Sequence, residues 1–235
     1  MSHDFGLLFT TRHGGVSTAP YDSWNLGSVD NTAEDISRNY EILAAASTPK
    51  IARTSQVHGS RVVTVTQDYP FWPRVTPVLP QADAMVTTEP GVALAIRVAD
   101  CVPVLFVDTR AGVIGAVHAG REGLLAGVVE ATIAEMTAVG ATQIHAWIGP
   151  HICPGCYEVP PEMAHKAWMQ IPETEAQSHH GTPAIDLGAG VEEILQRNGI
   201  RGTHTGECTS CDRRYFSYRR DQGKTGRQAG LIWLK

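Results

Sequence analysis

Three residues of the chain could hold a metal ion between them: His58, Cys101 and His118. Two histidines and one cysteine suit zinc, and three ligands leave the fourth tetrahedral position open for water or substrate. Each lies at the end of a strand-like run, where a rigid scaffold can direct side chains into a shared cleft. The three are far apart in sequence, so two hydrogen-bonded histidines and a buried, inert cysteine are an alternative interpretation.

Four of the five cysteines form two C-x-x-C pairs, Cys153 with Cys156 and Cys208 with Cys211. Two such pairs are typical of a structural zinc site with four thiolate ligands. The segment between them is longer than in zinc ribbons. A redox dithiol or four unlinked thiols are therefore alternatives.

Two basic segments could bind an anion. Arg12 follows a strand-like run and precedes a Gly14-Gly15 turn, whose backbone N–H groups could face an anion. A second group of basic residues, from Arg219 to Arg227, lies near the C-terminus. A guanidinium suits phosphate, although a solvated run of charge would look the same.

The elements that must position these residues are strands in the first half of the chain, with helices interspersed later. Apolar runs predict strands over 5–10, 62–66, 84–88, 92–98, 102–108, 113–118 and 230–234. Helical spacing predicts a helix starting after Asp30 or Asn31 and others over about 123–139, 161–169 and 187–197. This order favours an α+β fold with mixed sheets over regular βαβ alternation. The length favours a single domain over 1–235.

Composition excludes several classes of protein. Hydrophobic residues make up 43% and charged residues 18%, as in an ordered globular protein. Lys and Arg number 19 against 24 Asp and Glu, so the net charge of −5 argues against binding nucleic acid through a basic surface. No run reaches the ~20 apolar residues that span a bilayer, and the first residues do not resemble a signal peptide. We therefore expect a cytoplasmic protein without a membrane partner, with cysteines as thiols or metal ligands.

Taken together, these motifs resemble the YfiH, or laccase-domain, family, also called multicopper polyphenol oxidase-like proteins. The matching segments follow one another along nearly the whole chain: 11–17, 25–27, 56–59, 82–84, 99–103, 117–120, 148–150, 156–159, 216–220 and 225–227.

The resemblance implies a four-layer α/β/β/α arrangement with mixed sheets and a zinc ion on the residues that match His58, Cys101 and His118. Members are described as purine nucleoside phosphorylases that also deaminate adenosine and cleave methylthioadenosine. The implied partners are thus a small nucleoside and phosphate. Copper-dependent oxidation of polyphenols and editing of peptidoglycan precursors are other roles described for the family.

A zinc-dependent purine nucleoside enzyme is therefore the leading hypothesis. In it, Arg12 would orient phosphate, and Asp100 would move a proton or position the site. One departure bears on the substrate: the family's His-Ala-Gly-Trp-Arg-Gly reads His-Ala-Gly-Arg-Glu-Gly here, which places Arg121 and Glu122 after the third ligand. If Glu122 faced the substrate it would repel an anion, and Arg121 could compensate.

Three rival hypotheses remain open. Cys101 and His118 could be the nucleophile and base of a Cys–His hydrolase. The C-x-x-C pairs could form a non-catalytic metal or redox module. A copper oxidase is the weakest on chemistry, because several coppers need many histidine ligands and one compact set is evident. The sequence does not predict an oligomeric state.

Overall fold

The apolar runs form two mixed β-sheets. The computed structural model describes residues 3–27, 32–73 and 78–235. The four-stranded sheet has the order β1 (Phe5–Phe9), β12 (Gln228–Leu234), β5 (Val92–Val98), β2 (Lys50–Ala52). The six-stranded sheet has the order β11 (Arg201–His204), β8 (His145–Ile148), β6 (Val102–Asp108), β7 (Val113–Ala119), β4 (Ala84–Thr87), β3 (Val62–Thr64). A small hairpin pairs β9 (Glu175–Gln177) with β10 (Pro183–Ile185). Both large sheets are mixed, since β2–β5, β3–β4 and β8–β11 are parallel and the other pairs antiparallel.

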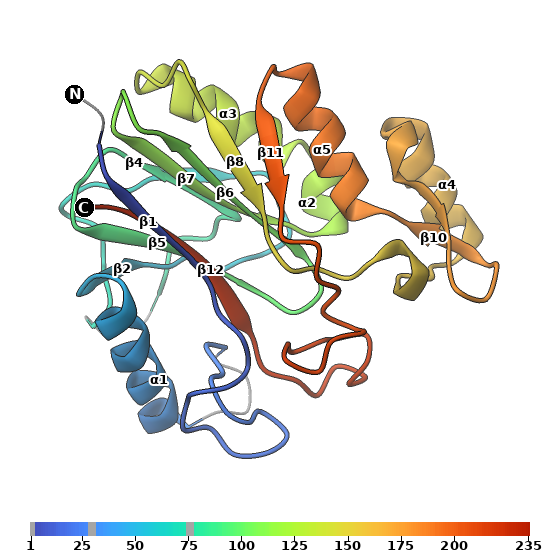
Figure 1. The fold of residues 1–235 in the computed structure, drawn as a ribbon, viewed down its shortest axis with the longest axis horizontal. Helices are drawn as coiled ribbons and strands as arrows, with labels where there is room; N and C mark the ends of the chain where they lie inside the picture. The colour runs from blue at the N-terminus through green and yellow to red at the C-terminus, as the bar shows by residue number, and fades with distance from the viewer. Residues whose placement is uncertain (1–2, 28–31, 74–77) are drawn as a thin grey trace.

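Helices cover the outer faces of the two sheets (Figure 1). On the four-stranded sheet, α1 (Ala33–Ala46) buries Tyr40 and Leu43 against Ile51. The six-stranded sheet packs against α3 (Val128–Ala138) and α5 (Leu187–Arg197), with α2 (Arg121–Leu125) and α4 (Pro161–Gln170) beside them. Two 3₁₀ turns, η1 (Pro154–Cys156) and η2 (Pro172–Thr174), flank α4. This is the expected four-layer α/β/β/α fold.

The two sheets pack on each other through the centre of the molecule. Leu94 and Ile232 of one sheet meet Leu105 and Ile114 of the other in a buried cluster. Every residue of β6 and β7 is buried, because helices cover one face of these strands and the second sheet covers the other. Burial on both faces explains why these strands are continuous apolar runs and do not alternate with polar residues.

The structure corrects one expectation and confirms another. The helix expected over 123–139 is two helices, α2 and α3, separated at Gly127, whose φ of 83° is left-handed and interrupts the helical path. The helix expected after Asp30 or Asn31 begins at Ala33, where the Thr32 side chain accepts a hydrogen bond from the Asp35 amide. Asp30 and Asn31 themselves lie outside the described residues.

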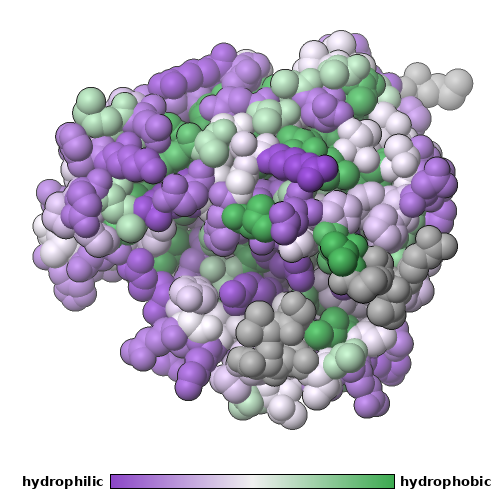
Figure 2. Space-filling model, turned by 180° about the vertical axis from the view of Figure 1, so that it is seen from behind, coloured by the Kyte–Doolittle hydropathy of each residue, from purple (hydrophilic) through white to green (hydrophobic). Residues whose placement is uncertain are grey.

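Hydrophilic side chains predominate on the face shown in Figure 2, and hydrophobic ones gather there in small separate groups. Within the described ranges, no helix has the length and apolar character needed to cross a bilayer.

Candidate active site

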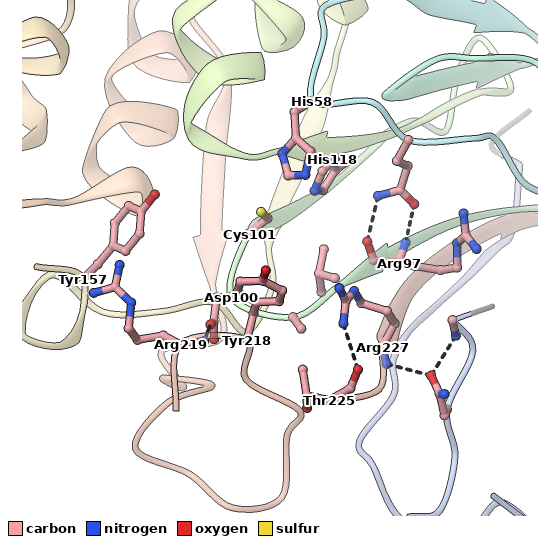
Figure 3. A pocket seen from close by; sticks show the side chains of 15 residues that line it. His58, Arg97, Asp100, Cys101, His118, Tyr157, Tyr218, Arg219, Thr225 and Arg227 are labelled. Carbon is pink, nitrogen blue, oxygen red and sulfur yellow. Dashed lines mark hydrogen bonds between the residues drawn. The ribbon is translucent and has the colours of Figure 1, made fainter. Parts of the chain in front are cut away.

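The fold brings His58, Cys101 and His118 together; we call these residues the three-ligand cluster. His58 lies in the loop between β2 and β3, Cys101 in the turn from β5 to β6, and His118 in β7. Their ligand atoms all lie within 4.8 Å of one another, and Figure 3 shows the two imidazoles above the Cys101 sulfur. Because β5 and β6 belong to different sheets, the cluster forms where the chain passes from one sheet to the other.

Gly120 makes room for this cluster. A Cβ atom at this position would lie 2.6 Å from His58 Nδ1 and 3.1 Å from Cys101 Sγ. The first contact is closer than Cβ atoms come in proteins and the second is tight, so a side chain here would displace His58 or Cys101.

The carboxylate of Asp83 holds both histidines in place. It accepts hydrogen bonds from the amides of Val57, His58 and Gly59 at 3.1, 2.9 and 2.8 Å, and these bonds hold His58 at a left-handed φ of 59°. Asp83 Oδ1 also lies 2.8 Å from His118 Nδ1. With Nδ1 engaged, Nε2 is the nitrogen of His118 left to bind a metal.

The protonation states of the cluster fit a metal cation. Burial lowers the pKa of His118 and so favours the neutral imidazole that ligates metals. Burial raises the pKa of Asp83, but hydrogen bonds from His118 and two amides outweigh it, so the pKa is lowered and the group is a carboxylate. Burial, assisted by the charge of Asp100, raises the pKa of Cys101 to about 12. A cation beside this sulfur would favour the thiolate. Two nitrogens and one sulfur are a suitable donor set for zinc with an open position.

The cluster opens into a cavity of about 550 Å³, which is within the range of small-molecule sites. Three arginines line it, Arg97, Arg219 and Arg227, together with the aromatic rings of Tyr157 and Tyr218. The cavity therefore combines a set of candidate metal ligands, positive charge and aromatic surface.

Hydrogen bonds from both its backbone amide and its guanidinium fix the position of Arg227. Its amide donates to Asn25 Oδ1 at 2.9 Å, and its Nη1 donates to the carbonyls of Thr225 and Gly226 at 3.0 and 2.8 Å. Burial lowers the pKa of Arg227. A partly desolvated guanidinium held in this way can attract an anion strongly.

Asp100 lines the same cavity with both carboxylate oxygens engaged. Oδ1 accepts from Thr209 Oγ1 at 2.7 Å and Oδ2 from the Arg219 amide at 2.6 Å. Its φ of 87° is left-handed, and the two hydrogen bonds help to hold the turn that carries Cys101. Of the two roles expected for Asp100, this geometry suits positioning.

Arg12 is not among the residues that line the cavity. Its Nε donates to the Asp22 carbonyl at 2.7 Å, its Nη2 lies 3.1 Å from Asp22 Oδ1, and its guanidinium stacks on the Phe216 ring. The structure thus brings Asp100 to the three-ligand cluster but leaves Arg12 at a neighbouring loop.

The Arg121–Glu122 departure also lies outside the cavity. Arg121 Nη2 is 2.7 Å from Glu122 Oε1, and Lys166 Nζ is 3.6 Å from Glu122 Oε2. Neither Arg121 nor Glu122 lines the cavity. The negative charge of Glu122 is balanced by Arg121 and Lys166.

Sequence reasoning gave no role to Asp83 and did not single out Arg227 within its basic segment. A signal for Asp83 was present, because a charged residue immediately before the buried apolar strand β4 needs buried partners. For Arg227 the signal was its place in the basic segment and in the family-like segment 225–227, but its partner Asn25 lies 202 residues away and was not predictable.

Comparison with known sequences matches residues 6–235 to the family described as multi-copper polyphenol oxidoreductase laccase. A relative named purine nucleoside phosphorylase in Streptomyces coelicolor is 45% identical over 96% of this chain and 94% of its own length. Another with that name in Corynebacterium glutamicum is 43% identical over 97% of this chain and 93% of its own.

Solved structures agree with the fold. A Neisseria meningitidis crystal structure covers 100% of this chain and 98% of its own, with a TM-score of 0.86 and 35% identity. YlmD from Geobacillus stearothermophilus covers 98% of this chain and 92% of its own, with a TM-score of 0.89 and 30% identity.

Proposed function

Because the chain belongs to the multi-copper polyphenol oxidoreductase laccase family, we propose that it has the activity for which its relatives are named, the phosphorolysis of purine nucleosides. The observation that carries this proposal is the three-ligand cluster at the wall of a cavity lined by arginines. The ligands would hold one zinc ion. When bound, zinc supplies Lewis acidity at a position left open to water or a substrate oxygen.

Donor chemistry favours zinc over copper. Oxidation by several coppers needs several histidine-rich sites, and in the described part of the chain one of the two ligand clusters contains histidine. A His₂Cys set could bind one copper, so metal analysis must accompany every activity measurement.

The chain's own residues would do the remaining work. Arg227 would hold phosphate beside the ribose, in place of Arg12, and Tyr157 would offer a ring face to the purine. Phosphate attacks the anomeric carbon as the glycosidic C–N bond breaks, which yields free base and ribose 1-phosphate. Asp83 would keep His118 oriented, and Asp100 would position the Cys101 turn.

The same cavity would accept adenosine, inosine and methylthioadenosine, which differ at the purine amino group or at the ribose 5′ position. With water at the open position, adenosine could also lose its amino group by hydrolysis. We therefore propose adenosine deamination as a second reaction of this site.

The test is to incubate the chain with each nucleoside, with and without phosphate, and to identify every product. Phosphate-dependent release of base is expected, with an equal amount of ribose 1-phosphate from adenosine or inosine and of 5-methylthioribose 1-phosphate from methylthioadenosine. Inosine from adenosine is the expected mark of deamination. The Cys–His hydrolase would instead be indicated if metal-free protein released base without phosphate and thiol alkylation blocked this release. Turnover of polyphenols or peptidoglycan precursors without any nucleoside reaction would overturn the proposal.

A further inference from the structure

The remaining cysteines form a second cluster away from the cavity. The sulfur atoms of Cys153, Cys156, Cys208 and Cys211, here called the four-cysteine cluster, all lie within 4.8 Å of one another. Cys156 Sγ and Cys211 Sγ are 3.4 Å apart, and all four residues are free thiols. None of the four lines the cavity beside the three-ligand cluster.

The sheet topology explains why two distant C-x-x-C pairs meet. β8 and β11 are parallel neighbours, with Ile148 opposite His204, so their carboxyl ends share one edge of the sheet. Each C-x-x-C pair lies in the loop that follows one of these strands (Figure 1). A further bridge between His151 and Cys208 continues the pairing into the two loops.

Backbone amides point at one of the sulfur atoms. Cys208 Sγ accepts from the Cys153 amide at 3.2 Å and from the Cys211 amide at 3.4 Å. The first pair is itself folded as a tight turn, in which the Cys156 amide donates to the Cys153 carbonyl at 3.0 Å. Such turns place both sulfurs of a C-x-x-C pair on the same side, as a shared metal ligand set requires.

We propose that the four-cysteine cluster binds one structural zinc ion through four thiolates. Sulfurs bound to one zinc at ~2.3 Å in tetrahedral geometry lie about 3.8 Å apart, so the present arrangement needs only small shifts to close on the ion. Four protein ligands leave no open position, in contrast to the three-ligand cluster. An all-thiolate tetrahedral set selects zinc or iron, and its lack of an open position suits a structural zinc.

This zinc would fix one wall of the cavity. Tyr157, which lines the cavity, follows Cys156 directly. Thr209, which follows Cys208, donates to Asp100 at 2.7 Å. The ion would therefore clamp together the two loops that hold Tyr157 and Asp100 in place.

Elemental analysis of four purified proteins tests the proposal. The native chain should carry about two equivalents of zinc, and Cys101→Ala about one, because that change empties the three-ligand cluster alone. The double variant Cys153→Ser/Cys208→Ser should also carry about one equivalent. Ser210→Ala alters the same loop without removing a sulfur and should keep the native content.

Cobalt substitution identifies the ligands. The cobalt-loaded Cys101→Ala chain should show the strong visible bands of tetrahedral cobalt with four thiolates, and removing Cys153 and Cys208 as well should abolish them. If the double variant does not fold, Cys211→Ser, whose side chain is the exposed member, should weaken the bands and lower the zinc affinity.

Three results would overturn the proposal. The first is a Cys101→Ala chain that contains no zinc while the native chain contains one equivalent. Thiol titration of the unfolded, unreduced chain could find fewer than the five thiols of the sequence, which would mean disulfides. Iron could occupy the cluster in place of zinc. Each result is independent of whether the chain cleaves nucleosides.

Discussion

At the scale of single residues, the site depends on groups that touch no substrate in the proposed reaction. Asp83 is fully buried, and its carboxylate joins the loop that carries His58 to the ring of His118. Such carboxylate–histidine contacts fix both the orientation and the protonated nitrogen of a ligand. Asp83 is therefore expected to set metal affinity.

Replacing Asp83 with Asn should weaken metal binding about 10–100-fold, because the amide cannot accept as many hydrogen bonds from the ring and the loop amides. The measurement is zinc affinity by competition with a chromogenic chelator. Asp108→Asn is the matched control, since Asp108 is also a buried carboxylate with several amide donors but lies away from the cavity. Equal zinc affinity in Asp83→Asn and the native chain would contradict this assignment.

Replacing Arg227 with Gln should raise the KM for phosphate about tenfold or more, which corresponds to losing one charge-assisted hydrogen bond of ~1.4 kcal/mol or stronger. The KM for nucleoside should change less. Arg12→Gln removes a guanidinium that is paired with Asp22 and lies outside the cavity, so it should affect the KM for phosphate less than Arg227→Gln. The opposite order would return the phosphate role to Arg12.

At the scale of elements, another buried carboxylate ties the end of β6 to the turn before β7 and to the loop before β8. Asp108, at the end of β6, accepts from the amides of Arg110 and Ala111 at 2.9 and 3.0 Å. It also accepts from the amides of Thr142 and Gln143, both at 2.7 Å. Burial raises the pKa of Asp108, but these four bonds outweigh it, so the pKa is lowered.

This shift predicts a pH-dependent stability. A carboxyl group whose pKa is lower in the folded chain stabilises it above the unfolded pKa of about 3.9, and the contribution is lost as the pH falls through the folded value. Asp108→Asn should lower the free energy of unfolding by about 2–3 kcal/mol at neutral pH. Urea titrations should show that the difference in free energy of unfolding between the native chain and Asp108→Asn narrows below about pH 4. A difference in free energy of unfolding that stays constant down to about pH 3 would contradict the lowered pKa of Asp108.

Elements with a strong local pattern were predictable, and those that depend on distant partners were not. The apolar runs of β5, β6 and β7 identified the strands of the core. By contrast, β11 is a short and largely exposed strand that exists only because β8 lies beside it. Periodicity alone extended a helix through Gly127, where the backbone turns left-handed.

The same distinction applies to the site. The three candidate metal ligands were identifiable, because each lies at the end of a recognisable strand or turn. The meeting of the two C-x-x-C pairs was not predictable, because it depends on β8 and β11 being neighbours in the sheet. Asp83 and Arg227 act through partners brought close only by the folded chain.

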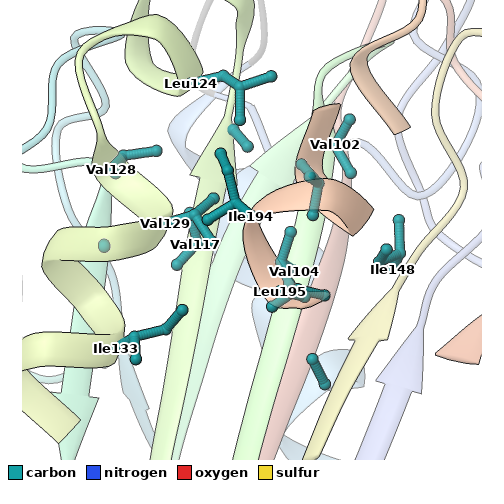
Figure 4. Close-up of a cluster of buried hydrophobic side chains, with 14 of the residues drawn as sticks. Val102, Val104, Val117, Leu124, Val128, Val129, Ile133, Ile148, Ile194 and Leu195 are labelled. Atoms are coloured by element: carbon teal, nitrogen blue, oxygen red, sulfur yellow. The ribbon is translucent and has the colours of Figure 1, made fainter. Parts of the chain in front are cut away.

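At the scale of the whole molecule, the layers that stabilise the fold and the site that uses it are separable. Figure 4 shows Ile194 of α5 packed with Leu195 over the strands that carry Val104 and Val117. This cluster fills the space between the helices and the six-stranded sheet. The three-ligand cluster instead lies where the chain passes from the four-stranded sheet to the six-stranded sheet, between β5 and β6.

Ile194→Ala should therefore lower the free energy of unfolding by about 2–5 kcal/mol, through lost burial and the cavity left behind. Its metal content and cavity residues should be unchanged, because Ile194 belongs to the helix–sheet cluster and is not among the residues that line the cavity. Chemical denaturation and elemental analysis of the same sample check both parts. A decrease in the free energy of unfolding of less than about 1 kcal/mol would contradict this prediction. A loss of metal without any loss of stability would contradict the claim that the fold layers and the site are separable.

The central claim is that a metal ion at His58, Cys101 and His118 is required for phosphorolysis of purine nucleosides. The most direct measurement strips the chain of metal with a chelator and follows ribose 1-phosphate formation as zinc is returned. We predict no activity in the stripped chain, recovery with added zinc, and no recovery in Cys101→Ala under the same conditions. A stripped chain that keeps its full rate, or a Cys101→Ala variant as active as the native chain, would contradict the claim.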